Sequence, residues 1–288
     1  MESLSYSPGH ITGFFVICDE DNDPLHKGSM GAGIVTSKGV KTSVRIKESD
    51  KRELSIFINN VPEDYPVSKY VVDKLAKGNL KIEVRHVLDV PRGVGFGTSG
   101  ACALSLSLAL NDALGLGYSY NYLAQIAHRA EIANMSGLGD VIAETTHGFE
   151  IRVSPGAPAV GKVDHIPDER YKVICACLSP LDTKRIITDP LHKENINKFG
   201  LKSLENLKRK KTVDKFMELS RNFAFSIGLM SKEVFEIIKK MEENGFMASM
   251  AMLGNTVFVV SRDLDAIPLL KGYNLVVTNV SRYGARLL

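Results

Sequence analysis

The sequence predicts an α+β fold of about two domains. Strand-like and helical segments are mixed without a strict βαβα rhythm, which favours α+β over a doubly wound parallel sheet. The length of 288 residues corresponds to about two domains of roughly 150 residues each. Hydrophobic residues make up 44% and charged residues 24% of the chain. This composition is typical of a globular protein and argues against disorder and low complexity.

The first part of the chain is predicted to be rich in strands. Runs of β-branched and aromatic residues, separated by Gly, Pro, Asn and Asp, predict strands at 10–20, 31–37, 40–46 and 53–58. The segment 80–90 alternates apolar and other residues, which is typical of a strand with one buried face. His86 belongs to that apolar face, and we expect it to be a half-buried structural histidine.

Two helices and a strand are predicted to complete this part. Helical patterns run from about 99 to 114 and from about 122 to 134, and each ends at a glycine-containing turn. The segment 148–153 is a predicted strand. The turn-rich segment 154–162 follows it and is the predicted domain boundary. We therefore expect an N-terminal domain over 1–158 and a C-terminal domain over 159–288.

The C-terminal part is predicted to begin with an apolar strand at 172–178, in which Cys175 and Cys177 are small buried residues. The patterns that follow predict helices at 183–188, 193–207, 212–228 and 231–243, and then strands at 246–252, 256–261 and 274–280. The basic run 208–211 lies between two predicted helices, where a solvated surface is expected.

Charge and hydropathy argue against several classes of protein. Lys and Arg total 36 and Asp and Glu total 33, a net charge of +3 that does not suggest a nucleic-acid or membrane partner. No stretch approaches 18 uninterrupted apolar residues, so a membrane-spanning helix is not expected. The first ten residues lack the basic and then apolar order of a secretory signal. The expected location is the cytoplasm.

A glycine-rich loop between the predicted strand 80–90 and the next helix is the strongest functional signal. Glycines at alternate positions allow close approach of the backbone to a ligand, and the helix that follows presents free N–H groups. The P-loop Lys is missing, and the G-x-G-x-x-G at 95–100 lacks the later acidic strand end of a dinucleotide site. A turn without a ligand remains the alternative. The predicted phosphate-binding residues are Pro91, Gly93, Gly95, Gly97, Thr98, Ser99, Gly100 and Ala101.

The segment Pro-x-x-x-Gly-Phe-Gly-Thr-Ser-Gly-Ala at 91–101 resembles the phosphate loop of the GHMP small-molecule kinases. Phe96 and Thr98 are mild departures from the usual pattern of that family. The resemblance implies a two-lobed fold with the active site between an N-terminal and a C-terminal lobe. It also implies that ATP is the phosphoryl donor and that Ser99 ligates Mg²⁺.

Two carboxylates downstream fit the same resemblance. Glu131 shares a helix face with His128, three residues before it, and Asp140 follows the turn at Ser136-Gly137. A kinase needs one carboxylate to hold Mg²⁺ and another to accept the proton of the attacking hydroxyl. The resemblance implies that Glu131 holds Mg²⁺ together with Ser99 and that Asp140 is the general base.

The segments 8–15 and 23–33, with the His-Arg-Ala-Glu and Gly-Leu-Gly-Asp motifs at 128–131 and 137–140, resemble the archaeal pantoate kinases of this family. This resemblance implies ATP-dependent phosphorylation of the 4-hydroxyl of pantoate in coenzyme A biosynthesis. A small hydroxy acid needs polar and cationic ligands, and Arg152 is the predicted partner of its carboxylate. The predicted substrate ligands are Ser29, His128, Arg152 and Thr183.

Several alternatives stay open at this level. The segment 248–254 has fewer glycines than the usual C-terminal motif of the family, so a core strand with a turn at 254–255 is expected there and no nucleotide contacts are assigned. A GHMP kinase for homoserine, mevalonate or another small alcohol is one alternative, and a non-catalytic nucleotide-binding sensor is another. The lack of an aromatic–basic surface pattern disfavours nucleic-acid binding. Apolar content and the resemblance suggest a homodimer.

Overall fold

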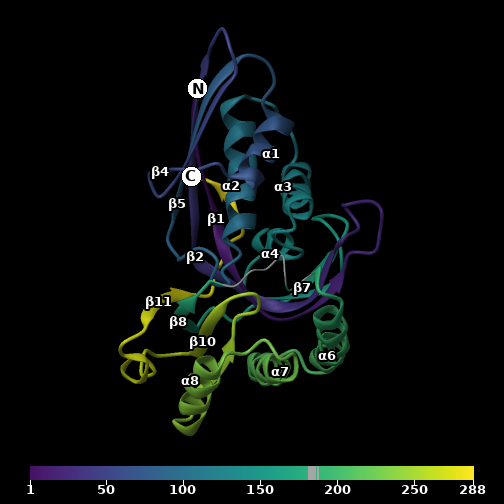
Figure 1. The fold of residues 1–288 in the computed structure, drawn as a ribbon, viewed down its shortest axis with the longest axis vertical. Helices are drawn as coiled ribbons and strands as arrows, with labels where there is room; N and C mark the ends of the chain where they lie inside the picture. Colours follow the sequence, from purple (N-terminus) through teal and green to yellow (C-terminus); the bar gives the residue numbers. More distant parts are fainter. Residues whose placement is uncertain (181–185, 187) are drawn as a thin grey trace.

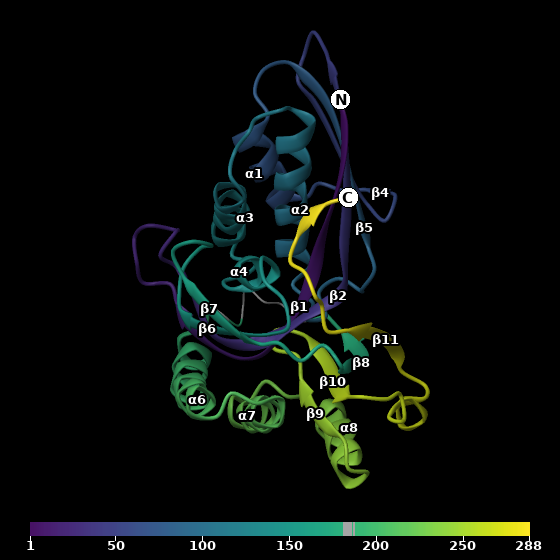
Figure 2. The same ribbon diagram turned by 180° about the vertical axis from the view of Figure 1, so that it is seen from behind.

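The computed structural model describes residues 1–180, 186 and 188–288. It consists of two lobes stacked along the long axis (Figure 1). One lobe carries helices α1 to α3 on one face of a large sheet, and the other carries α6 to α8 beside a smaller sheet, as the view from behind also shows (Figure 2). The mixture of segregated sheets and helices confirms the predicted α+β class. Among the described residues, no helix has both the length and the apolar character needed to cross a membrane.

The larger sheet has the order β12-β1-β2-β5-β3-β4, with β6 paired to β2 and β7 paired to β6. All pairs are antiparallel except β3 with β5. The first half of β2 pairs with β6 and its second half with β5, so one strand links the two parts of the sheet. Its strands are β1 (Glu2–Cys18), β2 (Gly28–Glu48), β3 (Glu53–Ile58), β4 (Val61–Pro62), β5 (Leu80–Leu88), β6 (Phe149–Ser154), β7 (Lys162–Ile166) and β12 (Arg286–Leu287).

Helix α2 is the central helix of this lobe, and it is buried on nearly all sides between the sheet and its neighbouring helices. A helix that is apolar around its circumference needs this position in the core. The helix that follows it begins at the N-cap Ser119, whose side chain accepts a hydrogen bond from the Tyr122 amide. The helices of this lobe are α1 (Pro66–Leu75), α2 (Thr98–Ala113), α3 (Tyr120–Asn134) and α4 (Asp140–Glu144).

The smaller sheet has the antiparallel order β11-β8-β10-β9. Its strands are β8 (Lys172–Ser179), β9 (Met247–Met250), β10 (Asn255–Ser261) and β11 (Asn274–Asn279). The accompanying helices are α6 (Pro190–Arg209), α7 (Val213–Ser226), α8 (Lys232–Glu243) and the short 3₁₀ helix η1 (Ile267–Leu270). Phe216 and Phe223 of α7 pack against Phe14 of β1, with ring centroids 6.3 Å apart in both pairs, so one hydrophobic core extends across both lobes.

The structure corrects several sequence-based expectations. The segments 31–37 and 40–46 belong to one strand, β2, because pairing with β1 continues through the expected break. His86 is fully buried rather than half-buried, because α1 and α2 cover that face of the sheet. Helices α1 and α4 and strands β4, β7 and β12 were not expected. Cys175 and Cys177 are buried in β8, as predicted.

Two expectations stay untested. The helix expected at 183–188 falls mainly on residues outside the described part of the chain. The division into domains at 158/159 stays a prediction, and the larger sheet includes β7 and β12, which follow that point in the sequence.

Candidate active site

The glycine-rich loop connects β5 to α2 and forms one wall of a pocket. Gly97 is the N-cap of α2 and has a φ of 60°, in the left-handed region that favours glycine. A Cβ at this position would lie 2.8 Å from Glu144 Oε1 and 3.0 Å from Asp140 Oδ1. The first N–H groups of α2 lack partners within the helix, and the helix dipole adds positive potential there. The loop therefore has the backbone geometry expected of an anion-binding site, beside two carboxyl groups.

Glu131, on α3, approaches the start of α2 from the side. Ser99 Oγ donates to its Oε2 over 3.1 Å, and Ser136 Oγ donates to its Oε1 over 2.7 Å. Burial of the carboxyl group and the nearby charge of Asp140 raise the pKa of Glu131 to about 7, although the two hydroxyl groups oppose this shift. The carboxyl group is thus poised to change its charge near neutral pH.

Gly137 leaves a gap next to these carboxylates. A Cβ on this residue would collide with Glu131 Oε2 and would lie 2.9 Å from Asp140 Oδ2. Oxygen ligands beside an open space suit Mg²⁺, which prefers one or two carboxylates together with phosphate and water oxygens. The residues present therefore fit the expected ion. Among the described residues, no group of three His, Cys, Asp or Glu side chains is arranged to hold a metal by itself.

Asp140 is the first residue of α4, and its side chain is 20% exposed and lines the pocket. Its Oδ1 lies 2.8 Å from Nδ1 of His10, a fully buried residue of β1. The other ring nitrogen of His10 lies 2.9 Å from Oε1 of Glu150 on β6. Arg152, two residues further along β6, donates to the same oxygen of Glu150. A chain of four charged or polar groups therefore extends from the pocket into the interior.

The sequence analysis assigned no role to His10 or Glu150. One signal was available: Glu150 and Arg152 interrupt an apolar run and lie two residues apart, so they share one face of a strand. No local pattern connects His10 to either of them, because they are 140 and 142 residues apart in the sequence.

A second, smaller pocket adjoins the first and is lined by Ser29, Gly139 and Asp140. Ser29 is buried. A Cβ on Gly139 would collide with Ser29 Oγ and would lie 2.9 Å from Nε of Arg152. This Nε is buried and has no hydrogen-bond partner among the described residues. The two predicted substrate ligands therefore meet behind Gly139, close to Asp140.

The other two predicted substrate ligands are His128 and Thr183. His128 is buried, and its Nε2 lies 3.1 Å from the carbonyl oxygen of Pro24 and 3.0 Å from that of Lys27. The ring is thus engaged with the connection that leads to Ser29, not with the lining of either pocket. Thr183 lies outside the described residues.

Glu144, on α4, is a further carboxyl group that the sequence analysis did not single out. It is fully buried under Gly97 and Gly100, and neither of its oxygens has a hydrogen-bond partner among the described residues. Burial, together with the charges of Asp140 and Glu131, raises the pKa of Glu144 well above its usual range.

The segment after β9 closes the pocket opposite the glycine-rich loop. The predicted strand at 246–252 ends at Met250, and a turn over 251–254 precedes β10. The Met252 amide donates to the carbonyl oxygen of Thr12 over 2.9 Å, and Thr12, Met252 and Leu253 line the pocket. This segment of the C-terminal lobe therefore contributes to the site, although sequence analysis assigned it no ligand contacts.

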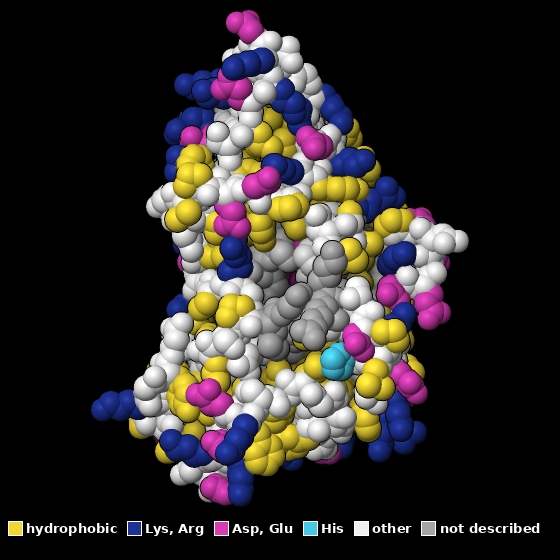
Figure 3. All heavy atoms as spheres, viewed as in Figure 1, with side chains coloured by type: hydrophobic (Ala, Val, Ile, Leu, Met, Phe, Trp, Pro, Cys, Tyr) yellow, Lys and Arg dark blue, Asp and Glu magenta, His cyan; other side chains and the backbone are white. Residues whose placement is uncertain are grey.

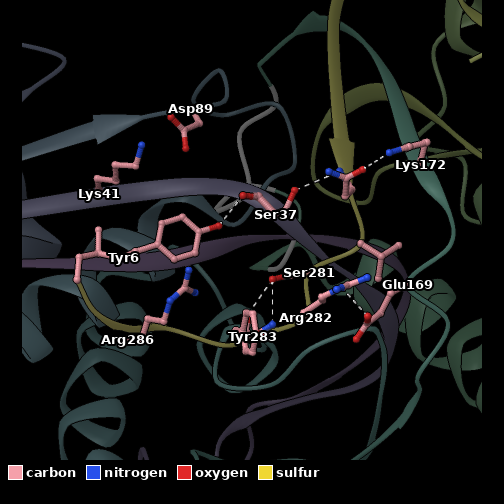
Figure 4. A pocket seen from close by; sticks show the side chains of 13 residues that line it. Tyr6, Ser37, Lys41, Asp89, Glu169, Lys172, Ser281, Arg282, Tyr283 and Arg286 are labelled. Atoms are coloured by element: carbon pink, nitrogen blue, oxygen red, sulfur yellow. Dashed lines mark hydrogen bonds and ion pairs between the residues drawn. The ribbon is translucent and has the colours of Figure 1, made fainter.

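A larger cavity of about 570 Å³ lies elsewhere, near the C-terminus (Figure 4). Among its lining residues, Arg282 lies 2.7 Å from Glu169, and the Arg286 guanidinium lies over the rings of Tyr6 and Tyr283. None of the predicted site residues lines it. Positive and negative side chains are interspersed on the face of the molecule shown in Figure 3. We therefore assign the candidate active site to the pocket at the glycine-rich loop.

Comparison with known proteins agrees with this assignment. The family model for the N-terminal domain of GHMP kinases matches residues 65–148, and the model for the C-terminal domain matches residues 202–271. A protein of Methanocaldococcus jannaschii named pantoate kinase is 38% identical over 281 residues, which cover 96% of this chain and 99% of that protein. A pantoate kinase of Thermococcus kodakarensis is 36% identical over 91% of this chain and 88% of its own length.

A solved structure described as a phosphotransferase related to the CoA biosynthesis pathway superposes with a TM-score of 0.92 at 32% identity. The alignment covers 100% of this chain and 99% of that one. Both lobes and both sequence domains are thus shared with GHMP kinases. The chain therefore belongs to the GHMP kinase family and is a kinase.

Proposed function

We propose that this kinase transfers the terminal phosphoryl group of ATP to the 4-hydroxyl of pantoate, forming 4-phosphopantoate for coenzyme A biosynthesis. The observation that carries the proposal is the meeting of the glycine-rich loop and Asp140 around one pocket that adjoins Ser29, with Glu131 hydrogen-bonded to Ser99 of the pocket lining. The relatives named pantoate kinase, which match over at least nine-tenths of the chain, support the choice of substrate. A cytoplasmic homodimer remains a prediction from sequence and family.

In this proposal the backbone N–H groups at 95–101 bind the phosphate oxygens of ATP, and Ser99 and Glu131 hold Mg²⁺. A bound Mg²⁺ would neutralise charge on the phosphate oxygens. Phosphoryl transfer requires little covalent chemistry from the protein, so positioning and charge stabilisation by these groups account for most of the rate.

Asp140 accepts the proton of the 4-hydroxyl as that oxygen bonds to the phosphorus and the bond from phosphorus to the leaving oxygen of ADP breaks. Its place between the glycine-rich loop and the Ser29 pocket supports this role. Ser29 lines the smaller pocket and positions the substrate there. Arg152 stays the predicted partner of the substrate carboxylate, with an unpartnered Nε that is buried behind Gly139 and does not line either pocket. His128 and Thr183 stay predicted ligands, and the contacts of His128 favour an indirect role through the Pro24–Lys27 connection.

The proposal is tested with the purified protein, ATP and Mg²⁺ against pantoate, homoserine and mevalonate at equal concentrations. We expect pantoate to have the highest kcat/KM, and ³¹P NMR should identify 4-phosphopantoate as the product. The Asp140→Asn variant is the matched control for contaminating kinases. A higher kcat/KM for another alcohol would show that pantoate is not the preferred substrate. ATP binding without phosphorylation of any of the alcohols would favour the alternative that the protein is a non-catalytic nucleotide-binding sensor.

A further inference from the structure

A buried chain of alternating charges connects the candidate base to the interior of the larger sheet. Asp140 on α4, His10 on β1, and Glu150 and Arg152 on β6 contact one another in that order. His10, Glu150 and Arg152 are at most 1% exposed, and only Asp140 reaches the pocket. Such a row of charged groups costs desolvation energy unless the members neutralise one another.

The two carboxylate contacts of His10 favour a charged ring. Nδ1 lies 2.8 Å from Asp140 Oδ1, and Nε2 lies 2.9 Å from Glu150 Oε1. An ionised carboxylate only accepts hydrogen bonds, and a neutral imidazole has only one N–H to donate. A neutral ring would therefore direct a lone pair at one carboxylate, whereas an imidazolium donates to both. Nη1 of Arg152 donates to the same Glu150 oxygen and also lies 3.3 Å from Nε2, where it can donate only to a neutral ring. The charged form is the one in which both ring nitrogens donate to carboxylates.

The Asp140 carboxylate is oriented by the same contacts. Its Oδ1 faces His10 and the side of Gly97, whereas its Oδ2 faces the gap at Gly137. Two other carboxyl groups, Glu131 and Glu144, are close enough to interact electrostatically with Asp140. Among the described residues, His10 is the cationic partner that contacts Asp140 directly. Without it, Asp140 would face two carboxyl groups with no opposing charge in contact.

We infer that His10 is a positioning residue of the kinase. As a fixed imidazolium, held by Glu150 and Arg152, it anchors Oδ1 of Asp140 and leaves Oδ2 free to accept the proton of the substrate hydroxyl. His10 keeps both of its ring protons throughout the transfer. The inference rests on the proposed function for the role of Asp140, but the charge and contacts of His10 can be tested without any substrate.

The kinetic test compares His10→Gln with His86→Asn, a matched control that changes the other fully buried histidine of the same sheet. We expect His10→Gln to lower kcat for pantoate by roughly 10- to 100-fold, as is common when a group that orients a functional residue is removed. Because Asp140 loses its cation, the acid limb of the kcat–pH profile should also move to higher pH. The KM for ATP and the profile of His86→Asn should stay close to those of the wild type.

Glu150→Gln provides a second variant in case His10→Gln does not fold, and circular dichroism checks the fold of each. It should shift the acid limb in the same direction, because without the Glu150 carboxylate the nearby Arg152 charge disfavours the imidazolium that pairs with Asp140. The shift should be smaller than in His10→Gln, because the ring still contacts Asp140. A folded His10→Gln protein with wild-type kcat and an unshifted profile would overturn the inference. So would a loss of kcat without any change in the pH profile, because that result indicates a purely structural role.

An NMR measurement separates this inference from the proposed function. In wild-type protein labelled with ¹⁵N at histidine, both ring nitrogens of His10 should show imidazolium shifts that stay constant between about pH 6 and 8. His86 should remain neutral over the same range. A neutral His10 would overturn the inference even if pantoate is phosphorylated. If His10 is an imidazolium but the protein does not phosphorylate pantoate, the inferred charge of His10 stands and pantoate is excluded as the substrate.

Discussion

Two fully buried histidines of the larger sheet lie in opposite environments. His86 on β5 contacts the hydroxyl groups of Thr42 and Ser68, at 2.7 and 2.9 Å, and burial lowers its pKa to about 3. His10 on β1 lies between two carboxylates. Burial also opposes the charge of His10, but the hydrogen bonds to Asp140 and Glu150 and the charge of Glu150 outweigh it and raise the pKa.

The comparison shows that burial alone does not distinguish a structural histidine from a functional one. A hydroxyl group can donate or accept, so two hydroxyls satisfy a neutral ring in either tautomer. A carboxylate can only accept, so two carboxylates favour a charged ring that donates from both nitrogens. The hydrogen-bond partners therefore distinguish the two histidines: hydroxyl groups surround His86 in the packed interior, and carboxylates surround His10 beside the candidate active site.

The largest expected effect on turnover comes from replacing Asp140, the carboxylate in the pocket that contacts His10. Asp140→Asn keeps the shape of the side chain but removes its basicity, so we expect turnover to fall by about 10²-fold or more. ATP binding, measured by calorimetry, should stay nearly unchanged because the glycine-rich loop is intact. Turnover close to that of the wild type would exclude Asp140 as the base.

Glu131, a buried carboxyl group close to Asp140, should also make the stability of the protein depend on pH. The pKa of Glu131 is raised from 4.5 to about 7 in the folded state, so the folded protein retains a proton that the unfolded chain releases. The raised pKa therefore adds to the free energy of unfolding below the pKa of Glu131 in the unfolded chain. This stabilisation, of up to about 3 kcal/mol, is lost as pH rises through the pKa of Glu131 in the folded protein.

Glu131→Gln removes this dependence and should raise the free energy of unfolding at pH 8 relative to wild type, without Mg²⁺. Urea denaturation at pH 5 and pH 8 measures the difference. The same variant should weaken the dependence of activity on Mg²⁺. Equal pH dependence of stability in the two proteins would contradict the raised pKa.

The cation at the inner end of the chain has a smaller expected effect. Arg152→Lys keeps a positive charge beside Glu150 but loses the Nε donor next to Gly139. Because a hydrogen bond to a charged group contributes about 1.5–3 kcal/mol, the KM for pantoate should rise about tenfold or more. An unchanged KM with normal kcat would show that the substrate carboxylate is bound elsewhere.

The smallest effect on activity is expected from replacing His86, the histidine with hydroxyl partners. His86→Asn removes one of the two side-chain hydrogen bonds with Thr42 and Ser68 and should lower the free energy of unfolding by about 1 kcal/mol. Turnover at saturating substrate should not change. Thermal denaturation together with steady-state kinetics checks both expectations, and a fall in kcat as large as that in His10→Gln would remove the distinction between the two histidines.

Local patterns in the sequence predicted much of the framework. The glycines at 93–97 and the helix that follows are set by backbone conformation and the 3.6-residue period, both of which operate over a few residues. Alternation along 80–90 likewise placed His86 on the buried face, but its complete burial depends on packing against α1 and α2, which lie outside that segment. Glu131 and Asp140 became candidates through the family resemblance of nearby motifs.

The tertiary structure decided which distant groups meet. His10 lies 130 residues from Asp140 and 140 from Glu150, and no local period connects such positions. The contact of the 251–254 turn with Thr12 likewise depends on packing between the lobes. The sequence by itself indicated many of the strands and helices and the glycine-rich loop before α2, because those follow from neighbouring residues. Folding alone decided the surroundings of His10, because the packed sheet and α4 bring Asp140 and Glu150 to its two ring nitrogens.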